Sequence, residues 1–144
     1  MTRQETTNHR PPEYNLWHRT LPDDCPMMDI DCIEVRDGKV RAIVETGRMG
    51  IAKFSDWQRM ITREVARRLV VPCFFVEYYI NLDRPISNMF NVTNLMTNKI
   101  YKDIDDVTYR QFLMNFDIDI LERKVKKNEI ENKEWEIEIW KKKL

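Results

Sequence analysis

The sequence predicts an α/β fold in which helices flank a mixed β-sheet, with elements in the order α-β-β-α-β-β-α. Three observations predict it. Two β-rich segments flank the turn-forming pair Asp37-Gly38. An amphipathic helical pattern begins at Ser55, and an apolar run of strand length follows at residues 72–80. A strand, a helix and another strand in succession favour a mixed sheet with helices packed on it.

The composition indicates one globular domain. The chain has 144 residues, of which 42% are hydrophobic and 33% charged, which is enough for a single core. Its 24 basic and 24 acidic residues cancel, and this argues against a protein that coats nucleic acid by bulk charge. The longest apolar run is far shorter than the roughly 20 residues of a membrane span. We therefore expect no membrane association and an intracellular location, in the cytoplasm or nucleoid.

The three cysteines favour the same setting. Cys25, Cys32 and Cys73 are odd in number and have no C-x-x-C spacing, so a zinc site or a disulfide framework is not expected. Cys32 and Cys73 fall in strand-like segments, where we expect small buried side chains.

The chain divides into three parts. Residues 1–12 are polar and end in two prolines, which indicates a flexible arm. Residues 13–117 contain the predicted core, and residues 118–144 form a charged C-terminal extension. In this extension WEIEIW alternates with the period of an edge strand, whereas the surrounding lysines and glutamates suit an exposed helix equally well. Both alternatives remain open.

Within the core, each expected element has its own pattern. Tyr14, Trp17 and Leu21 recur at helical spacing, which predicts a short helix that packs on the sheet and ends before Pro22. The expected strands and the last helix occupy 29–36, 39–45, 72–80, 88–95 and 107–116.

The hairpin at Asp37-Gly38 has two possible registers. A two-residue turn pairs Arg36 with Lys39 and places Asp31 and Glu45 on opposite faces. A three-residue loop, with Gly38 as a left-handed bulge residue, pairs Val35 with Lys39 and brings Asp29, Asp31 and Glu45 to one face. We favour the second register, because it groups three carboxylates as a hard divalent cation requires.

The helix that follows has a defined start. Ser55 and Gln58 have the spacing of a capping box. An apolar stripe for packing on the sheet is predicted at Trp57, Met60, Ile61, Val65 and Leu69.

The segment DIDCIEVRDGKVRAIVETG, residues 29–47, resembles the signature of the PD-(D/E)XK nuclease superfamily. Asp31 lies fourteen residues before Glu45, Asp29 supplies a further acid, and the likeness covers roughly residues 13–95. The resemblance implies a restriction-endonuclease-like fold that hydrolyses phosphodiester bonds with Mg²⁺ or Mn²⁺. Asp31, Glu45, Asp29 and the backbone carbonyl of Thr46 are the expected metal ligands. Double-stranded or branched DNA is the expected substrate, and a homodimer the expected assembly.

Gly47 departs from this signature, because the superfamily has a lysine there that orients the attacking water. Arg48, Lys53 and Gln58 are candidates to replace it, and we favour Lys53, whose long side chain carries a point charge. The expected catalytic residues are therefore Asp31, Glu45, Lys53 and Gln58. The alternative is a catalytically inactive nuclease-fold protein that binds DNA or another protein as an accessory factor.

A basic stripe beside the apolar one is the predicted DNA contact. Arg59, Arg63 and Arg67 are spaced four residues apart on one helix, and Arg48 precedes that helix. Arginine offers both charge and bidentate geometry to phosphates, so these four residues are expected to follow a DNA backbone.

Overall fold

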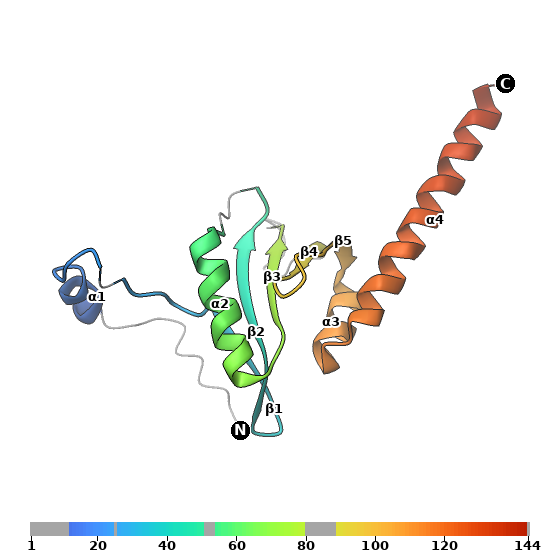
Figure 1. Ribbon diagram of the computed structural model, residues 1–144. Helices are drawn as coiled ribbons and strands as arrows, with labels where there is room; N and C mark the ends of the chain where they lie inside the picture. The colour runs from blue at the N-terminus through green and yellow to red at the C-terminus, as the bar shows by residue number, and fades with distance from the viewer. Residues whose placement is uncertain (1–11, 25, 51–53, 80–88, 144) are drawn as a thin grey trace.

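A computed structural model describes residues 12–24, 26–50, 54–79 and 89–143. It is an α/β structure with a five-stranded mixed sheet flanked by helices (Figure 1). The elements in chain order are α1 (Pro12–His18), β1 (Cys32–Arg36), β2 (Lys39–Arg48), α2 (Asp56–Leu69), β3 (Cys73–Tyr78), β4 (Met89–Asn94), β5 (Ile100–Asp105), α3 (Asp106–Asn115) and α4 (Ile118–Lys143). The expected order is confirmed as far as β4, and β5 and α4 extend it.

The strands lie in the sheet in their sequence order, β1-β2-β3-β4-β5. Strands β2 and β3 are parallel, and the other three neighbouring pairs are antiparallel. Helix α2 makes the crossover that parallel neighbours require. The sheet is therefore mixed, as the succession of strand, helix and strand predicts.

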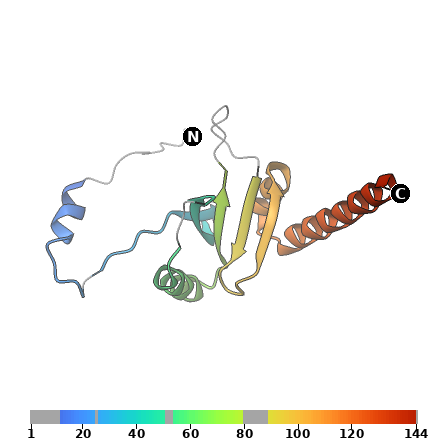
Figure 2. The same ribbon diagram turned by 90° about the horizontal axis from the view of Figure 1, so that it is seen from above.

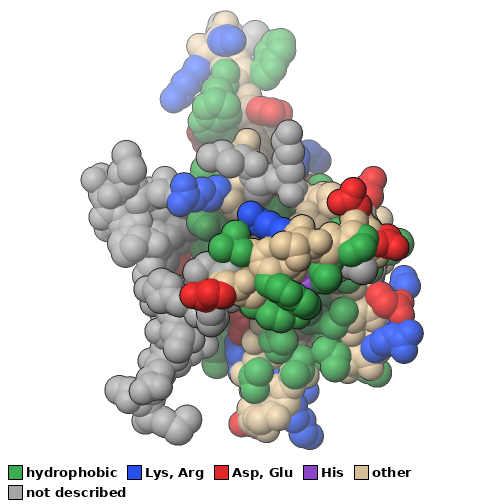
Figure 3. Space-filling model, turned by 90° about the vertical axis from the view of Figure 1, so that its left-hand side faces the viewer, with side chains coloured by type: hydrophobic (Ala, Val, Ile, Leu, Met, Phe, Trp, Pro, Cys, Tyr) green, Lys and Arg blue, Asp and Glu red, His purple; other side chains and the backbone are tan. Residues whose placement is uncertain are grey.

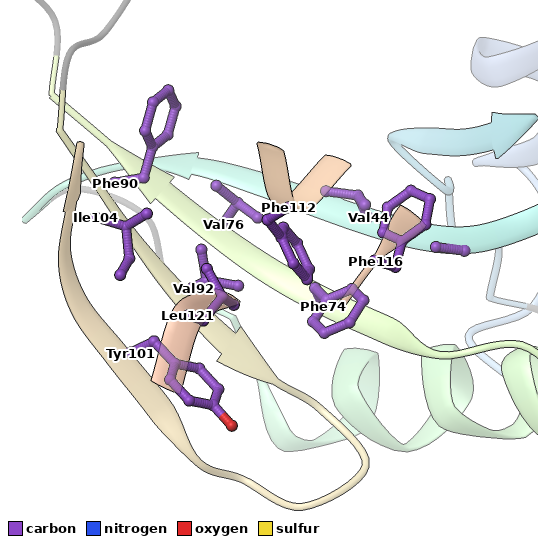
Figure 4. Close-up of a cluster of buried hydrophobic side chains, with 11 residues drawn as sticks. Val44, Phe74, Val76, Phe90, Val92, Tyr101, Ile104, Phe112, Phe116 and Leu121 are labelled. Atoms are coloured by element: carbon purple, nitrogen blue, oxygen red, sulfur yellow. The ribbon is translucent and has the colours of Figure 1, made fainter. Parts of the chain in front are cut away.

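Each face of the sheet has its own hydrophobic cluster. Helices α3 and α4 cover one face, where Phe74, Phe112 and Leu121 are fully buried (Figure 4). Phe74 meets Phe112 edge-on, with ring centroids 5.1 Å apart. Helix α2 covers the other face, where its Ala66 and Ile43 of β2 belong to one buried cluster, and Figure 2 shows α2 and α4 on opposite sides of the sheet. The structure thus has three layers, and the candidate site lies on the α2 side.

Helix α2 begins with the predicted capping box. The Gln58 N–H donates to Ser55 Oγ (3.1 Å), and the Ser55 N–H donates to Gln58 Oε1 (3.0 Å). The predicted apolar stripe is only partly correct: Val65 packs against the core, whereas Trp57, Met60 and Leu69 are exposed. The most buried positions are Thr62 and Ala66, each one residue beyond a member of the stripe. These small side chains let the helix lie close to the sheet, and this rotation leaves Trp57 exposed.

Strand β5 has no counterpart among the predicted elements. Its buried residues, Tyr101 and Ile104, are three positions apart rather than two, because the β4–β5 pairing contains an irregularity between Phe90 and Val92. Asp103 has a positive φ of 58° at the same place. A bulge of this kind breaks the alternation by which a strand is recognised in sequence.

The C-terminal extension is the helix α4, so the edge-strand alternative is wrong. Its first turns complete the core: Leu121 is fully buried, and Val125 packs beside it. The boundary predicted after residue 117 therefore divides a packed unit. Further along, α4 projects from the sheet (Figure 1), and Trp135 and Trp140 are 65% and 70% exposed. Glutamate and lysine favour a helix here, since no strand lies alongside for WEIEIW to pair with among the described residues.

The N-terminal helix does not pack on the sheet, and that prediction is wrong. Helix α1 lies apart from the other elements in Figures 1 and 2, and Tyr14 packs on Trp17 within the helix. Pro22 and Pro26 follow in a segment without regular structure, which carries the chain to β1. The predicted arm over residues 1–11 is outside the described residues.

Of the cysteines, Cys25 is also outside the described residues. Cys73 is a buried free thiol, as expected, whereas Cys32 is exposed because β1 is an edge strand. None of the helices in the described part of the chain combines the length and apolar character that a membrane span requires.

Candidate metal and substrate site

The hairpin that carries the site has a two-residue turn. Asp37 and Gly38 both have positive φ (53° and 72°), and Arg36 pairs with Lys39. These are the features of a type I′ turn, which matches the twist of the strands. The predicted three-residue loop with a bulge at Gly38 is therefore wrong.

A bulge elsewhere brings the acidic residues together. Val35 pairs with Val40, but Glu34 pairs with Ala42, so Arg41 is the extra residue on β2. One extra residue exchanges the two faces of a strand relative to its partner. The new register ends at Cys32 opposite Val44 and, continued by one residue, brings Asp31 level with Glu45.

Asp31 and Glu45 consequently form a carboxylate pair. The Asp31 N–H donates to Glu45 Oε2 (3.4 Å), and the Thr46 N–H donates to Asp31 Oδ2 (2.9 Å). Asp29 does not stand opposite Glu45 as predicted, because Asp31 takes that place. No group of three or more Asp, Glu, His or Cys side chains suited to a metal ion occurs in the part of the chain that the structure describes. Among the described residues the predicted ligands are thus represented by the pair, with Asp29 in the lining of the same pocket.

Glu45 has an unfavourable environment for a carboxylate. Glu45 is only 5% exposed, and its Oε1 is buried without a hydrogen-bond partner among the described residues. Burial, and then the charge of Asp31, raise the pKa of Glu45 from its ordinary 4.5 to about 7. Near neutral pH the pair therefore favours a bound proton or a bound cation.

The pair opens into a pocket of about 490 Å³ between the hairpin, α2 and the segment before β1. Five residues predicted for the site line it, namely Asp29, Asp31, Glu45, Thr46 and Gln58. The rest of the lining is apolar: Met27, Met28, Phe54, Trp57 and Phe75. The surface that the pocket exposes is mainly polar, and its carboxylates lie beside aromatic side chains.

Gln58 has a fixed orientation in this lining. Its Oε1 accepts hydrogen bonds from both the N–H (3.0 Å) and the hydroxyl (3.2 Å) of Ser55. Its amide NH₂ is then the end available to donate, since oxygen and nitrogen lie on opposite sides of the amide. The capping box thus gives a structural reason for the position of a predicted catalytic residue.

Gly47 lies one pleat beyond Glu45 on β2, and therefore on the same face. It pairs with Glu77 of β3, a partly buried carboxylate on that face which the sequence reasoning did not select. The favoured replacement for the missing lysine, Lys53, lies outside the described residues. Neither lysine nor arginine is found among the described residues of the pocket lining.

The four arginines predicted to bind DNA have different surroundings. Arg59 donates to Asn98 Oδ1 (2.8 Å), and Arg63 donates to the Leu95 carbonyl and to Asn98. Arg59 and Arg63 are half-buried and connect α2 to the β4–β5 turn. Arg48 and Arg67 are exposed, and none of the four lines the pocket.

The aromatic lining of the pocket was also missed from the sequence. Phe54 stacks on Phe75, with ring centroids 4.8 Å apart and planes 14° apart. Trp57, assigned to the buried stripe, is 42% exposed and lines the pocket instead. The sequence did indicate this position, because Trp57 lies two residues after the cap Ser55, in the same helical turn as Gln58, which was predicted to be catalytic.

Comparison with protein-family models, with curated proteins and with solved structures finds no match for this chain. The functional argument therefore depends on the residues of the pocket and their chemistry.

Proposed function

We propose that the chain is a metal-dependent nuclease that hydrolyses DNA phosphodiester bonds, with a restriction-endonuclease-like arrangement of its sheet. The observation that carries the proposal is the pairing of exposed Asp31 with buried Glu45, whose Oε1 has no hydrogen-bond partner among the described residues. Such an atom is costly in a protein interior unless a proton or a cation satisfies it.

The donor set fits Mg²⁺ or Mn²⁺. Hard cations prefer oxygen ligands, and Mg²⁺ is commonly held by one or two carboxylates while water and substrate phosphate complete its shell. Asp31 and Glu45 supply the carboxylates, and Asp29 and the Thr46 carbonyl are proposed as further ligands. When bound, the cation supplies a Lewis acid that neutralises charge on the scissile phosphate.

The protein groups have separate roles in this proposal. Asp31 is oriented by the Thr46 N–H, which holds one of its oxygens at 2.9 Å. The Gln58 amide, whose oxygen is occupied by Ser55, donates from its nitrogen to the attacking water or to a phosphate oxygen. Lys53 remains the proposed source of positive charge in place of the lysine absent at Gly47.

The test is cleavage of labelled DNA in Mg²⁺ or Mn²⁺. We expect Asp31→Asn and Glu45→Gln to lower the rate by at least about a hundredfold, because electrostatic groups of this kind contribute that much. Glu64→Gln is the matched control, since Glu64 is an exposed carboxylate on α2 paired with Arg68. Equal rates in the parent and in both site variants would refute the assignment.

Gly47 favours a second candidate, an inactive nuclease-fold accessory factor. This candidate expects the cation and DNA to bind without cleavage in any metal. Salt-sensitive DNA binding with no product, in the parent and in Gly47→Lys alike, would support it. Cleavage that appears only in Gly47→Lys would identify the glycine as the cause of inactivity.

A further inference from the structure

We infer that the substrate reaches this pocket as an unpaired nucleotide, with a base stacked on Trp57 and its neighbouring phosphate at Asp31 and Glu45. This inference rests on the proposed nuclease function and specifies its substrate. The juxtaposition that carries it is an exposed indole in the same pocket as exposed Asp31 and buried Glu45.

The indole is placed to receive a planar ligand. Trp57 lies in the first turn of α2, which is fixed by the Ser55–Gln58 capping box. Beside it, the stacked Phe54 and Phe75 rings form a rigid aromatic wall. At 42% exposure, Trp57 has a solvent-accessible surface that a ligand can cover. Aromatic side chains of this kind bind successive bases of single strands, whose π-faces are accessible only when the bases are unpaired.

The described residues of the pocket lining offer no positively charged side chain to a duplex backbone. Neither lysine nor arginine is among them, and Arg59 and Arg63 are engaged by Asn98 and the Leu95 carbonyl. Proteins that track a duplex depend on several such contacts to phosphates. In their place, Met27 and Met28 continue the apolar lining opposite α2.

The wider surface has the same character. Figure 3 views the molecule from the side on which α1 and α2 lie, and hydrophobic side chains gather near the centre of that face. On α2, which borders the pocket, the exposed hydrophobic side chains are Trp57, Met60 and Leu69, whereas α1 lies apart from the sheet. Aromatic side chains beside three carboxylates favour a ligand that contributes stacking as well as charge. A phosphate at the pair would still need the cation, since the acids alone repel it.

Binding to three matched probes tests the inference. We propose fluorescence anisotropy in Ca²⁺ with a labelled single strand, the same strand in a duplex, and an abasic strand of equal length. The single strand is expected to bind tightest. Trp57→Ala is expected to weaken single-strand binding roughly 5- to 150-fold, the equivalent of one stacked base, and to leave abasic binding unchanged.

Two further variants separate stacking from folding. Trp57→Phe keeps an aromatic face and is expected to retain most of the single-strand affinity. Trp135→Ala removes an indole that is 65% exposed on α4 and is expected to change nothing. Thermal denaturation of Trp57→Ala checks that the fold is intact.

The outcomes distinguish the two proposals. Equal affinity for duplex and single strand, or an equal loss with the abasic strand in Trp57→Ala, would overturn the unpaired-nucleotide inference. Metal-dependent cleavage that Glu45→Gln abolishes would leave the nuclease function standing in that case. No binding to any probe and no cleavage would overturn both.

Discussion

The pH dependence of stability is the most direct test of the carboxylate pair, because it requires no knowledge of the substrate. The pKa of Glu45 is raised from 4.5 to about 7 by burial and by Asp31. The folded protein therefore binds a proton more tightly than the unfolded chain does. The stabilising contribution is fully present below pH 4.5, declines as the pH rises, and is lost above about 7.

The magnitude follows from the same values. A rise from 4.5 to about 7, at about 1.4 kcal/mol per pKa unit, corresponds to at most about 3–4 kcal/mol of unfolding free energy. The Glu45 carboxyl borders an open pocket beside Asp31, so solvent screening makes this value an upper bound. In Glu45→Gln the ionisable group is gone. We expect this variant to lose that pH dependence and to be the more stable protein at about pH 8 in a chelator.

Urea denaturation between about pH 5 and pH 8, followed by circular dichroism, measures these differences. Glu64→Gln serves as the control and is expected to stay within about 0.5 kcal/mol of the parent, because Glu64 is an exposed carboxylate. If Glu45→Gln lost stability with rising pH as steeply as the parent, Glu45 would not be the group whose raised pKa causes this pH dependence.

The remaining predictions address the cation, the arginines, the core boundary and the missing lysine. Adding Mg²⁺ or Mn²⁺ at about a hundred times its dissociation constant should raise the unfolding free energy of the parent by about 3 kcal/mol, and that of Glu45→Gln by much less, in the same denaturation experiment. Arg63→Ala should lower the free energy of unfolding by about 1–3 kcal/mol, because it leaves the Leu95 carbonyl without its donor, whereas a purely DNA-binding arginine would not change it. Leu121→Ala should cost about 2–5 kcal/mol in thermal or urea unfolding, and a cost near zero would contradict our inclusion of early α4 in the core. Gly47→Lys should change the DNA cleavage rate by less than about tenfold, because Lys53 is the proposed source of that charge, and a gain of about tenfold or more would contradict this role of Lys53.

Local sequence signals predicted the features that depend on a few neighbouring residues. The capping box at Ser55 and Gln58 forms as expected, because both partners lie within one turn. Asp37-Gly38 forms the hairpin turn, and Asp31, one residue before β1, comes together with Glu45 of β2, although the strand predicted from residue 29 begins only at Cys32. The acidic pair was thus predictable from the sequence, although the strand register that forms it was not.

The register of the hairpin was decided by the pairing of β1 with β2. The sequence analysis placed a bulge at Gly38, because a glycine tolerates positive φ most easily. The structure instead has a type I′ turn there and a bulge at Arg41. Arg41 carries no signal of this, since a bulge depends on which residues of β1 and β2 meet across the sheet.

The orientation of α2 was decided in the same way. Its amphipathic pattern fixed a helix but not its rotation, and the sheet selected the small residues Thr62 and Ala66 for the close contact. This rotation directs Arg63 to the β4–β5 turn and leaves Trp57 in the pocket lining. Periodicity records which side chains are apolar, whereas the contact itself depends on how closely two surfaces can approach.

The sequence by itself therefore determined the α/β class, the hairpin, the start of α2 and the identity of the two carboxylates. Each of these depends on backbone preferences and hydrogen bonds within a few residues, or on the alternation along one strand. Only the tertiary structure decided that Glu45 is buried with an oxygen that no described residue hydrogen-bonds, that Arg59 and Arg63 bond to the β4–β5 turn, and that an indole borders the site. These properties arise from segments distant in the chain, since burial and electrostatic environment depend on every element packed around a group.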